Sequence, residues 1–162
     1  MKSLLLRYAL APNTAAVEAQ GEHQHIRVFV VLDKQSNLTD WGVSNAARVD
    51  AFATALISNR TNFNGVLNPL NLNYRERFRV LYDKFHTMSL ESTIQNGTPS
   101  YFFRQKFIKL GSREVTYGAN TGGTTQDINT NALIFFALAH DVNGATEFPV
   151  LHVSMRLRYT DS

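Results

Sequence analysis

Apolar and polar residues alternate along this chain much more often than apolar residues recur at helical spacing. Short apolar runs are separated by clusters of Gly, Asn, Pro and Ser. The last run is the clearest, because Leu, Val, Met, Leu and Tyr alternate with His, Ser and two Arg over residues 151–159. Alternation with period two predicts a strand with one face on the core and one polar, basic face. The whole pattern predicts an all-β sandwich or barrel.

Other runs predict further strands. Residues 3–10 indicate a first strand rather than a signal peptide, because Arg7 interrupts the leucine run and no small-residue cleavage site follows. Residues 26–33 and 132–139 are apolar on both faces, so we expect each to be covered on both sides, by a thick core or by a neighbouring subunit. Residues 101–110 and a shorter piece near 113–117 complete the set of predicted strands.

A long strand is predicted over residues 77–90, with Phe78, Val80 and Tyr82 on one face and a bulge at Asp83–Lys84. The polar segments 11–25 and 118–130 are expected to be surface loops. A single helix is predicted over residues 43–57, where apolar side chains have helical spacing and Ser44 or Asn45 would be the N-cap. The apolar side chains are Val49, Phe52, Ala53, Leu56 and Ile57.

Length and composition narrow the range of functions that the chain could have. A chain of 162 residues forms one domain with a real core, and the absence of cysteine excludes disulfides and thiolate metal sites. No apolar run approaches the roughly 18 residues that a membrane span needs, so we expect no membrane partner. The formal net charge of +3 permits contact with nucleic acid. The chain contains neither a phosphate-binding glycine loop nor a G-x-S-x-G motif, so we expect that it is not an enzyme.

Three segments, taken in order, resemble one protein family. These are Asn68-Pro69-Leu70-Asn71, the run at 75–84 (RERFRVLYDK), and the ending Tyr159-Thr160-Asp161-Ser162. The order is similar to that in capsid proteins of small circular single-stranded DNA viruses, the CRESS DNA viruses. It is also similar to the coat protein of satellite tobacco necrosis virus. The resemblance covers roughly residues 26–162 and depends on the order of the elements more than on any single motif.

The resemblance implies a single eight-stranded antiparallel jelly roll of two four-stranded sheets, with one short helix around 43–57. The first and last strands would be neighbours in one sheet, and the strands at 26–33 and 132–139 neighbours in the other. Residues 1–162 would form one capsid domain. Its function would be self-assembly, with on the order of sixty copies closing into the smallest icosahedral shell. The shell would enclose a viral single-stranded nucleic acid, DNA by the family comparison. The protein would then be found in the virion and in the host cell during assembly, including its nucleus.

The sequence departs from the family in one respect. Such coat proteins usually begin with a long arm rich in Arg and Lys, and this chain reaches its first predicted strand almost at once. A charge of +3 per subunit neutralises few phosphates, so packaging of the genome by this chain is less well supported than assembly.

The candidate nucleic-acid contacts are basic residues of predicted strands. Pairing of the terminal strands would place Arg7, Arg156 and Arg158 on one sheet face with His152, where they could contact phosphate. The alternative is a solvated polar face or a surface for salt bridges between subunits. Arg104, Lys106 and Lys109 follow three aromatic residues at 101–103, which could stack on bases or belong to the core.

We expect no cofactor other than a structural calcium ion at subunit interfaces, for which the family comparison makes Asp33, Asp50 and Asp161 the candidates. The cations Arg75, Arg77, Arg79 and Lys84, interrupted by Glu76 and Asp83, are expected to form ion pairs within or between subunits. Two other functions remain open. The chain could be a trimeric jelly-roll module that binds a ligand or carbohydrate, or a nucleic-acid-binding protein that does not assemble.

Overall fold

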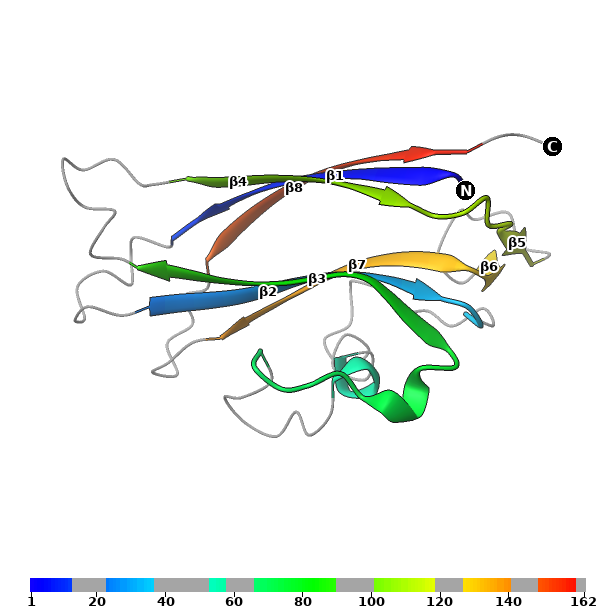
Figure 1. Cartoon of the computed structure of the whole chain (residues 1–162), viewed down its shortest axis with the longest axis horizontal. Helices are drawn as coiled ribbons and strands as arrows, with labels where there is room; N and C mark the ends of the chain where they lie inside the picture. The colour runs from blue at the N-terminus through cyan, green and yellow to red at the C-terminus, as the bar shows by residue number, and fades with distance from the viewer. Residues whose placement is uncertain are drawn as a thin grey trace.

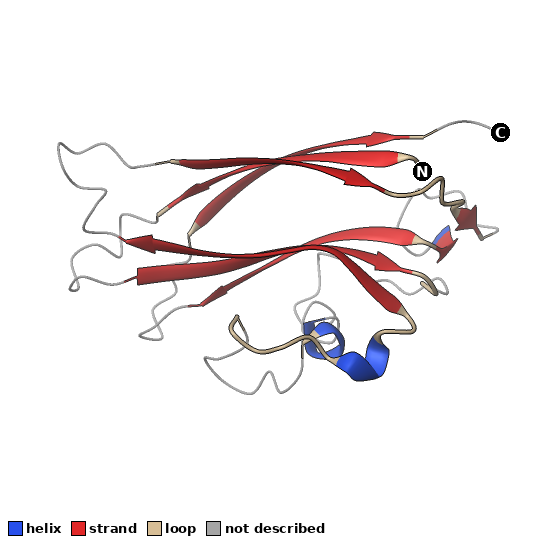
Figure 2. Ribbon diagram, in the orientation of Figure 1, coloured by secondary structure: helices blue, strands red, loops and turns tan. Residues whose placement is uncertain are grey.

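The computed structural model of the protein describes residues 1–12, 23–36, 53–57, 66–89, 101–118, 127–140 and 149–159. These residues are mostly antiparallel β-structure, as predicted, and they form two stacked layers (Figures 1 and 2). The strands are β1 (Ser3–Ala11), β2 (His23–Asp33), β3 (Phe78–Ser89), β4 (Phe102–Lys109), β5 (Thr116–Tyr117), β6 (Ile128–Thr130), β7 (Ala132–His140) and β8 (Val150–Arg158), with a short 3-10 helix, η2 (Leu72–Tyr74), before β3.

Two three-stranded antiparallel sheets make up the layers. The first has the order β4-β1-β8 and the second the order β3-β2-β7. The predicted neighbours are confirmed, because β1 pairs with β8 and β2 pairs with β7. The expectation of two four-stranded sheets is not met by the described residues, since β5 and β6 pair with each other in a separate ribbon. In the first sheet β4 pairs with the other edge of β1, and in the second β3 pairs with the other edge of β2.

The main core lies between the two sheets. Alternate residues of β1 point into it, and Leu4, Leu6 and Leu10 are almost fully buried there. Val28 and Val30 of β2 meet them from the opposite sheet. The alternation seen in the sequence therefore corresponds to one core-facing side of β1 and one outward side.

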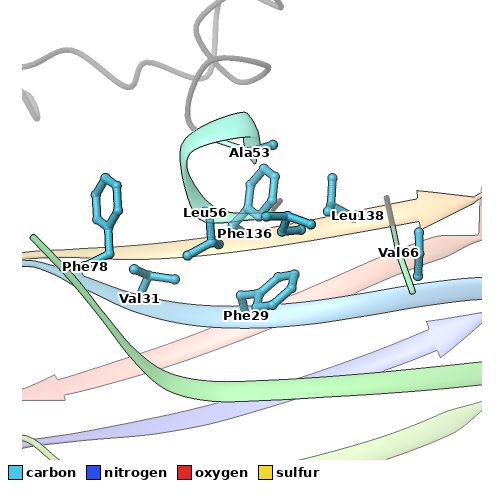
Figure 3. Packing of buried hydrophobic residues seen from close by; sticks show 9 residues of the cluster. Phe29, Val31, Ala53, Leu56, Val66, Phe78, Phe136 and Leu138 are labelled. Carbon is cyan, nitrogen blue, oxygen red and sulfur yellow. The ribbon is translucent and has the colours of Figure 1, made fainter. Parts of the chain in front are cut away.

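A second core lies on the outer side of the β3-β2-β7 sheet. Phe29 and Val31 of β2 project to this side, and Phe136 of β7 packs beside Phe29 (Figure 3). A helical turn at residues 53–56 covers them, with Ala53 and Leu56 both buried (Figure 3). The prediction that β2 and β7 are covered on both faces is therefore confirmed, and the cover on this side comes from the chain itself. This turn is the described part of the helix predicted at 43–57, and residues 43–52 lie outside the described residues.

The predicted face of β3 is wrong because a bulge shifts its register. Val30 pairs with Tyr82, whereas the next residue of β2, Val31, pairs with Val80, so one residue of β3 is extra at this point. Phe78 and Val80 therefore face the outer core, while Tyr82 faces the core between the sheets. A bulge was predicted at Asp83–Lys84, but the irregularity lies just before that position.

The prediction that β8 has a buried apolar face is also wrong for most of the strand. Leu151 packs on the core between the sheets, but Val153, Met155 and Leu157 are 37%, 50% and 39% exposed. Their partners on β1 are buried core residues, so these side chains lie on the inward side of the sheet. They are exposed because β8 is the edge strand of this sheet in the described part of the chain.

The predicted loops are shorter than expected at their ends. β1 continues to Ala11 and β2 begins at His23, so both strands enter the segment 11–25. Residues 128–130, predicted as loop, form β6 and pair with β5. Among the residues described, no helix is long and apolar enough to cross a membrane.

Candidate nucleic-acid interface

The outward side of the β4-β1-β8 sheet gathers most of the basic residues singled out in the sequence. Arg7 lies opposite Ser154 of β8 and Gln105 of β4, and Arg156 lies opposite Leu5. Residues directly opposite in antiparallel strands project to the same side. We call this surface the basic sheet face, and its members are Ser3, Leu5, Arg7, Ala9, Phe103, Gln105, Phe107, Lys109, His152, Ser154, Arg156 and Arg158.

The predicted grouping of Arg7, Arg156, Arg158 and His152 on one sheet face is confirmed by this register. Lys109 joins them from β4, so the face carries four permanent cations and no carboxylate. This side of the sheet therefore presents positive charge with no opposing carboxylate.

The cations of the basic sheet face are exposed and are not neutralised within the described part of the chain. Arg7, Lys109, Arg156 and Arg158 are all exposed, and none of them forms an ion pair with a described residue. The Arg7 side chain donates one hydrogen bond, from Nε to Gln105 Oε1 at 2.8 Å. That bond orients the guanidinium along the sheet and leaves its two terminal nitrogens for an anion.

Two aromatic rings stand on the same face. Phe103 is 71% exposed and Phe107 is 51% exposed, both on β4. Between β4 and β8 runs a groove of about 530 Å³ whose walls include Phe103, Gln105, His152 and Ser154. The small side chain of Ala9 lies opposite both Phe103 and His152, so it forms the floor of the groove between them.

Arg104 and Lys106, the other two candidates, lie on the opposite side of β4 from the basic sheet face. Their β1 partners are the buried residues Tyr8 and Leu6, so both side chains point toward the second sheet. The Arg104 guanidinium lies 4.3 Å from the centre of the Phe102 ring, a cation–π contact. The structure therefore divides the predicted basic residues between two surfaces.

Beneath Arg104, a hydrogen-bonded cluster joins two strands, β1 and β3. The Tyr8 hydroxyl lies 2.8 Å from the Tyr82 hydroxyl and 2.7 Å from Nε2 of His86. The His86 ring also packs on Phe102, with ring centres 4.9 Å apart. Burial, followed by the positive charges of Arg104 and Lys84, lowers the pKa of His86. Burial and the hydrogen bond with Tyr82 raise the pKa of Tyr8.

Asp33 was predicted as a calcium candidate, but its carboxylate has a structural partner. The side chain is fully buried, and its two oxygens accept hydrogen bonds from Nε and Nη2 of Arg77 at 3.0 and 2.9 Å. No group of three or more metal-ligating side chains occurs among the described residues. The other two candidates, Asp50 and Asp161, lie outside those residues.

Arg77 and Asp83 of the run at 75–84 form ion pairs within the chain, which confirms part of the predicted ion pairing. Arg77 binds Asp33, and Asp83 accepts two hydrogen bonds from Arg27 at 2.7 and 2.6 Å. Arg27 also donates to the backbone carbonyls of Val66 and Asn68. The run thus fastens β3 to β2 and holds the segment at 66–68 against the sheet.

Sequence reasoning missed Phe107 and Gln105 as members of the basic sheet face. The signal was present, because Phe103, Gln105, Phe107 and Lys109 alternate with the inward residues of β4. The aromatic run at 101–103 was considered as a unit, whereas successive strand residues point to opposite faces. Phe102 consequently faces inward and Phe103 outward.

No protein-family model matches this chain, and no curated protein matches it significantly.

Proposed function

We propose that this protein is a coat protein that self-assembles into a small closed shell around a single-stranded nucleic acid, with the basic sheet face turned toward that nucleic acid. The observation that carries the proposal is a set of four exposed cations on one side of one sheet, with no carboxylate on that face and no ion pair to any described residue. A shell subunit needs such an asymmetry, because only one of its sides meets the phosphates.

The arrangement of strands supports the jelly roll that the family resemblance implies. The first and last strands pair, and the second and seventh strands pair inside them in the other sheet. Nested pairing of this kind is what a jelly roll requires of its outer strands. We propose the jelly roll on the basis of these two pairings, whereas the pairing of β4 with β1 and of β3 with β2 differs from its usual strand order.

Surfaces for self-association are also available. The inward side of β8 presents half-exposed apolar side chains at the edge of the sandwich, including Met155 and Leu157. Rotationally related contacts between such edges close into rings, and rings about several axes close a shell. The family resemblance gives on the order of sixty copies and a DNA genome, and it places the protein in the virion.

The test is the mass and content of purified particles. Light scattering and negative-stain electron microscopy should show uniform hollow spheres with a mass near sixty times the 18.2 kDa of one chain. Co-purified nucleic acid that resists nuclease should fall in a variant with Arg7, Arg156 and Arg158 changed to Gln. A variant with Arg75→Gln, an exposed cation outside the basic sheet face, is the matched control.

Two results would contradict the proposal. A trimer that stays small over a wide range of pH, salt and calcium would favour a ligand-binding or carbohydrate-binding module. A monomer that binds nucleic acid without assembling would favour a simple nucleic-acid-binding protein.

A further inference from the structure

The basic sheet face carries two parallel stripes of different chemistry. On one edge strand, β4, the aromatic rings of Phe103 and Phe107 project outward, four residues apart. On the other edge strand, β8, Arg156 and Arg158 project outward with His152. Arg7 lies between the stripes on β1. Neighbouring strands are about 4.8 Å apart, so the aromatic and cationic stripes are separated by roughly 10 Å.

Exposed phenylalanine is unusual on a folded surface, and here the aromatic rings adjoin a cationic face. An aromatic ring at 71% exposure adds little to the core, so burial within the subunit does not explain Phe103. Bases stack on aromatic side chains whatever their sequence, because each base has a flat π-face. Unpaired Arg side chains bind phosphate through their forked donors.

We infer that the basic sheet face is a stacking platform for single-stranded DNA, with bases lying over Phe103 and Phe107 on β4 and phosphates over Arg7, Arg156 and Arg158. This inference rests on the proposed function, which supplies single-stranded DNA as the occupant. The face selects a single strand because a duplex keeps its bases stacked on one another and offers the aromatic stripe only its backbone.

The platform should tolerate any sequence. The polar side chains without a permanent charge in the middle of the face are those of Gln105, Ser154 and His152, and Gln105 already accepts a hydrogen bond from Arg7. A code for particular bases needs several donors and acceptors held at base edges. Binding should therefore depend on aromatic stacking and on salt, and little on base identity.

In the experiment, three labelled probes, each thirty nucleotides long, are titrated with the full-length protein. Fluorescence anisotropy measures the binding of each probe. The probes are oligo-dT, a DNA duplex, and an abasic strand that keeps the phosphates and sugars but has no bases. Oligo-dT should bind at least tenfold more tightly than the abasic strand. Phe103→Ala and Phe107→Ala should each weaken oligo-dT binding about fivefold or more, from the usual energy of stacking one base, and should leave abasic binding unchanged.

Three further variants test the cationic stripe, a control ring away from the face, and the aromatic character of Phe103. Arg156→Gln should weaken binding of all three probes and lower the salt slope measured between about 50 and 200 mM by roughly one. Tyr117→Ala removes an equally exposed ring from β5, away from the basic sheet face, and should change nothing. Phe103→Leu keeps the apolar volume but not the aromatic ring, so it should weaken oligo-dT binding as Phe103→Ala does.

The inference is overturned if the wild-type protein binds oligo-dT and the abasic strand equally, or if the double Phe103→Ala, Phe107→Ala variant binds oligo-dT like wild type. It is also overturned if that variant loses particle formation but keeps its DNA affinity, because the rings would then be subunit contacts. Its failure differs from failure of the proposed function, since nuclease-resistant particles would still form. Conversely, a monomer that prefers oligo-dT would support the platform and refute the shell.

Discussion

Both carboxylate oxygens of Asp33, the last residue of β2, accept hydrogen bonds from the guanidinium of Arg77, the residue that precedes β3. Asp33 is fully buried, whereas the Arg77 side chain is 27% exposed. The Asp33 carboxylate also accepts from the backbone N–H of Gln35 at 3.1 Å, so the pair fixes both the exit from β2 and the entry to β3. A buried carboxylate left without its cation is strongly unfavourable.

Arg77→Gln should therefore lower the free energy of unfolding by about 3 kcal/mol, because Asp33 would lose its charged partner while remaining buried. Urea denaturation followed by circular dichroism measures this loss. Arg75→Gln is the matched control, since the Arg75–Glu76 pair is exposed and its atoms are 3.8 Å apart. Its expected cost is near zero. Equal losses in both variants would contradict the structural role of Arg77.

Leu56→Ala should lower the free energy of unfolding by about 2–4 kcal/mol, because Leu56 is buried in the outer core against the β3-β2-β7 sheet and its truncation leaves a cavity. Thermal denaturation would detect the change. Thr54→Ala, on the exposed side of the same helical turn, should be close to neutral. If Leu56→Ala were also neutral, the helical turn would not cover the sheet in solution.

The β character, the positions of the main strands and the sharing of one face by Arg7, Arg156 and Arg158 could be predicted from the sequence. These features were predictable because a period-two pattern fixes which side chains share a face once two strands are known to pair. The orientation of Tyr82 could not be predicted, since a single extra residue in β3 reverses every face after it.

The exposure of the apolar side chains of β8 also could not be predicted from the alternating pattern. Alternating Val153, Met155 and Leu157 report which side of the sheet they occupy, but not whether another strand or subunit lies over them. The partner of the Asp33 carboxylate could not be predicted from the sequence either. A carboxylate at a strand end is as suitable for calcium as for a guanidinium, and only the fold brings Arg77 to it.

Stability should decrease as the pH falls through the range just below 6.5, because of His86. Burial, Arg104 and Lys84 lower the pKa of His86 in the folded state below its ordinary value of 6.5. The unfolded chain therefore takes up a proton first as the pH falls, and proton binding to the unfolded state destabilises the fold until the lowered folded pKa is reached. Tyr8 and Phe102 also contact the ring, and neither supplies a negative charge that would offset an imidazolium.

His86→Gln should flatten this pH dependence, because glutamine keeps a hydrogen-bonding group near Tyr8 but does not titrate. The measurement is the midpoint of urea unfolding between pH 5 and 8, the range in which an ordinary histidine titrates. His152→Gln, on the exposed basic sheet face, is the control and should retain the wild-type slope. A slope that persists in the His86 variant and disappears in the His152 variant would refute the assignment.

Met155→Glu should prevent particle formation while leaving the subunit folded. Met155 is 50% exposed on the inward side of β8, and the proposed function requires such apolar surface to be buried between copies. A carboxylate placed in a contact of this kind would lose its hydration without gaining a partner, which opposes association far more than it opposes folding of the free subunit. Sedimentation should then show a small species whose circular dichroism matches the wild-type protein.

Thr54→Glu, a new carboxylate on the exposed side of the helical turn, controls for the added charge. Normal particles from Met155→Glu would exclude the inward side of β8 from the subunit contacts, and an unfolded product would mean that β8 is more deeply buried in the free subunit than its exposure indicates.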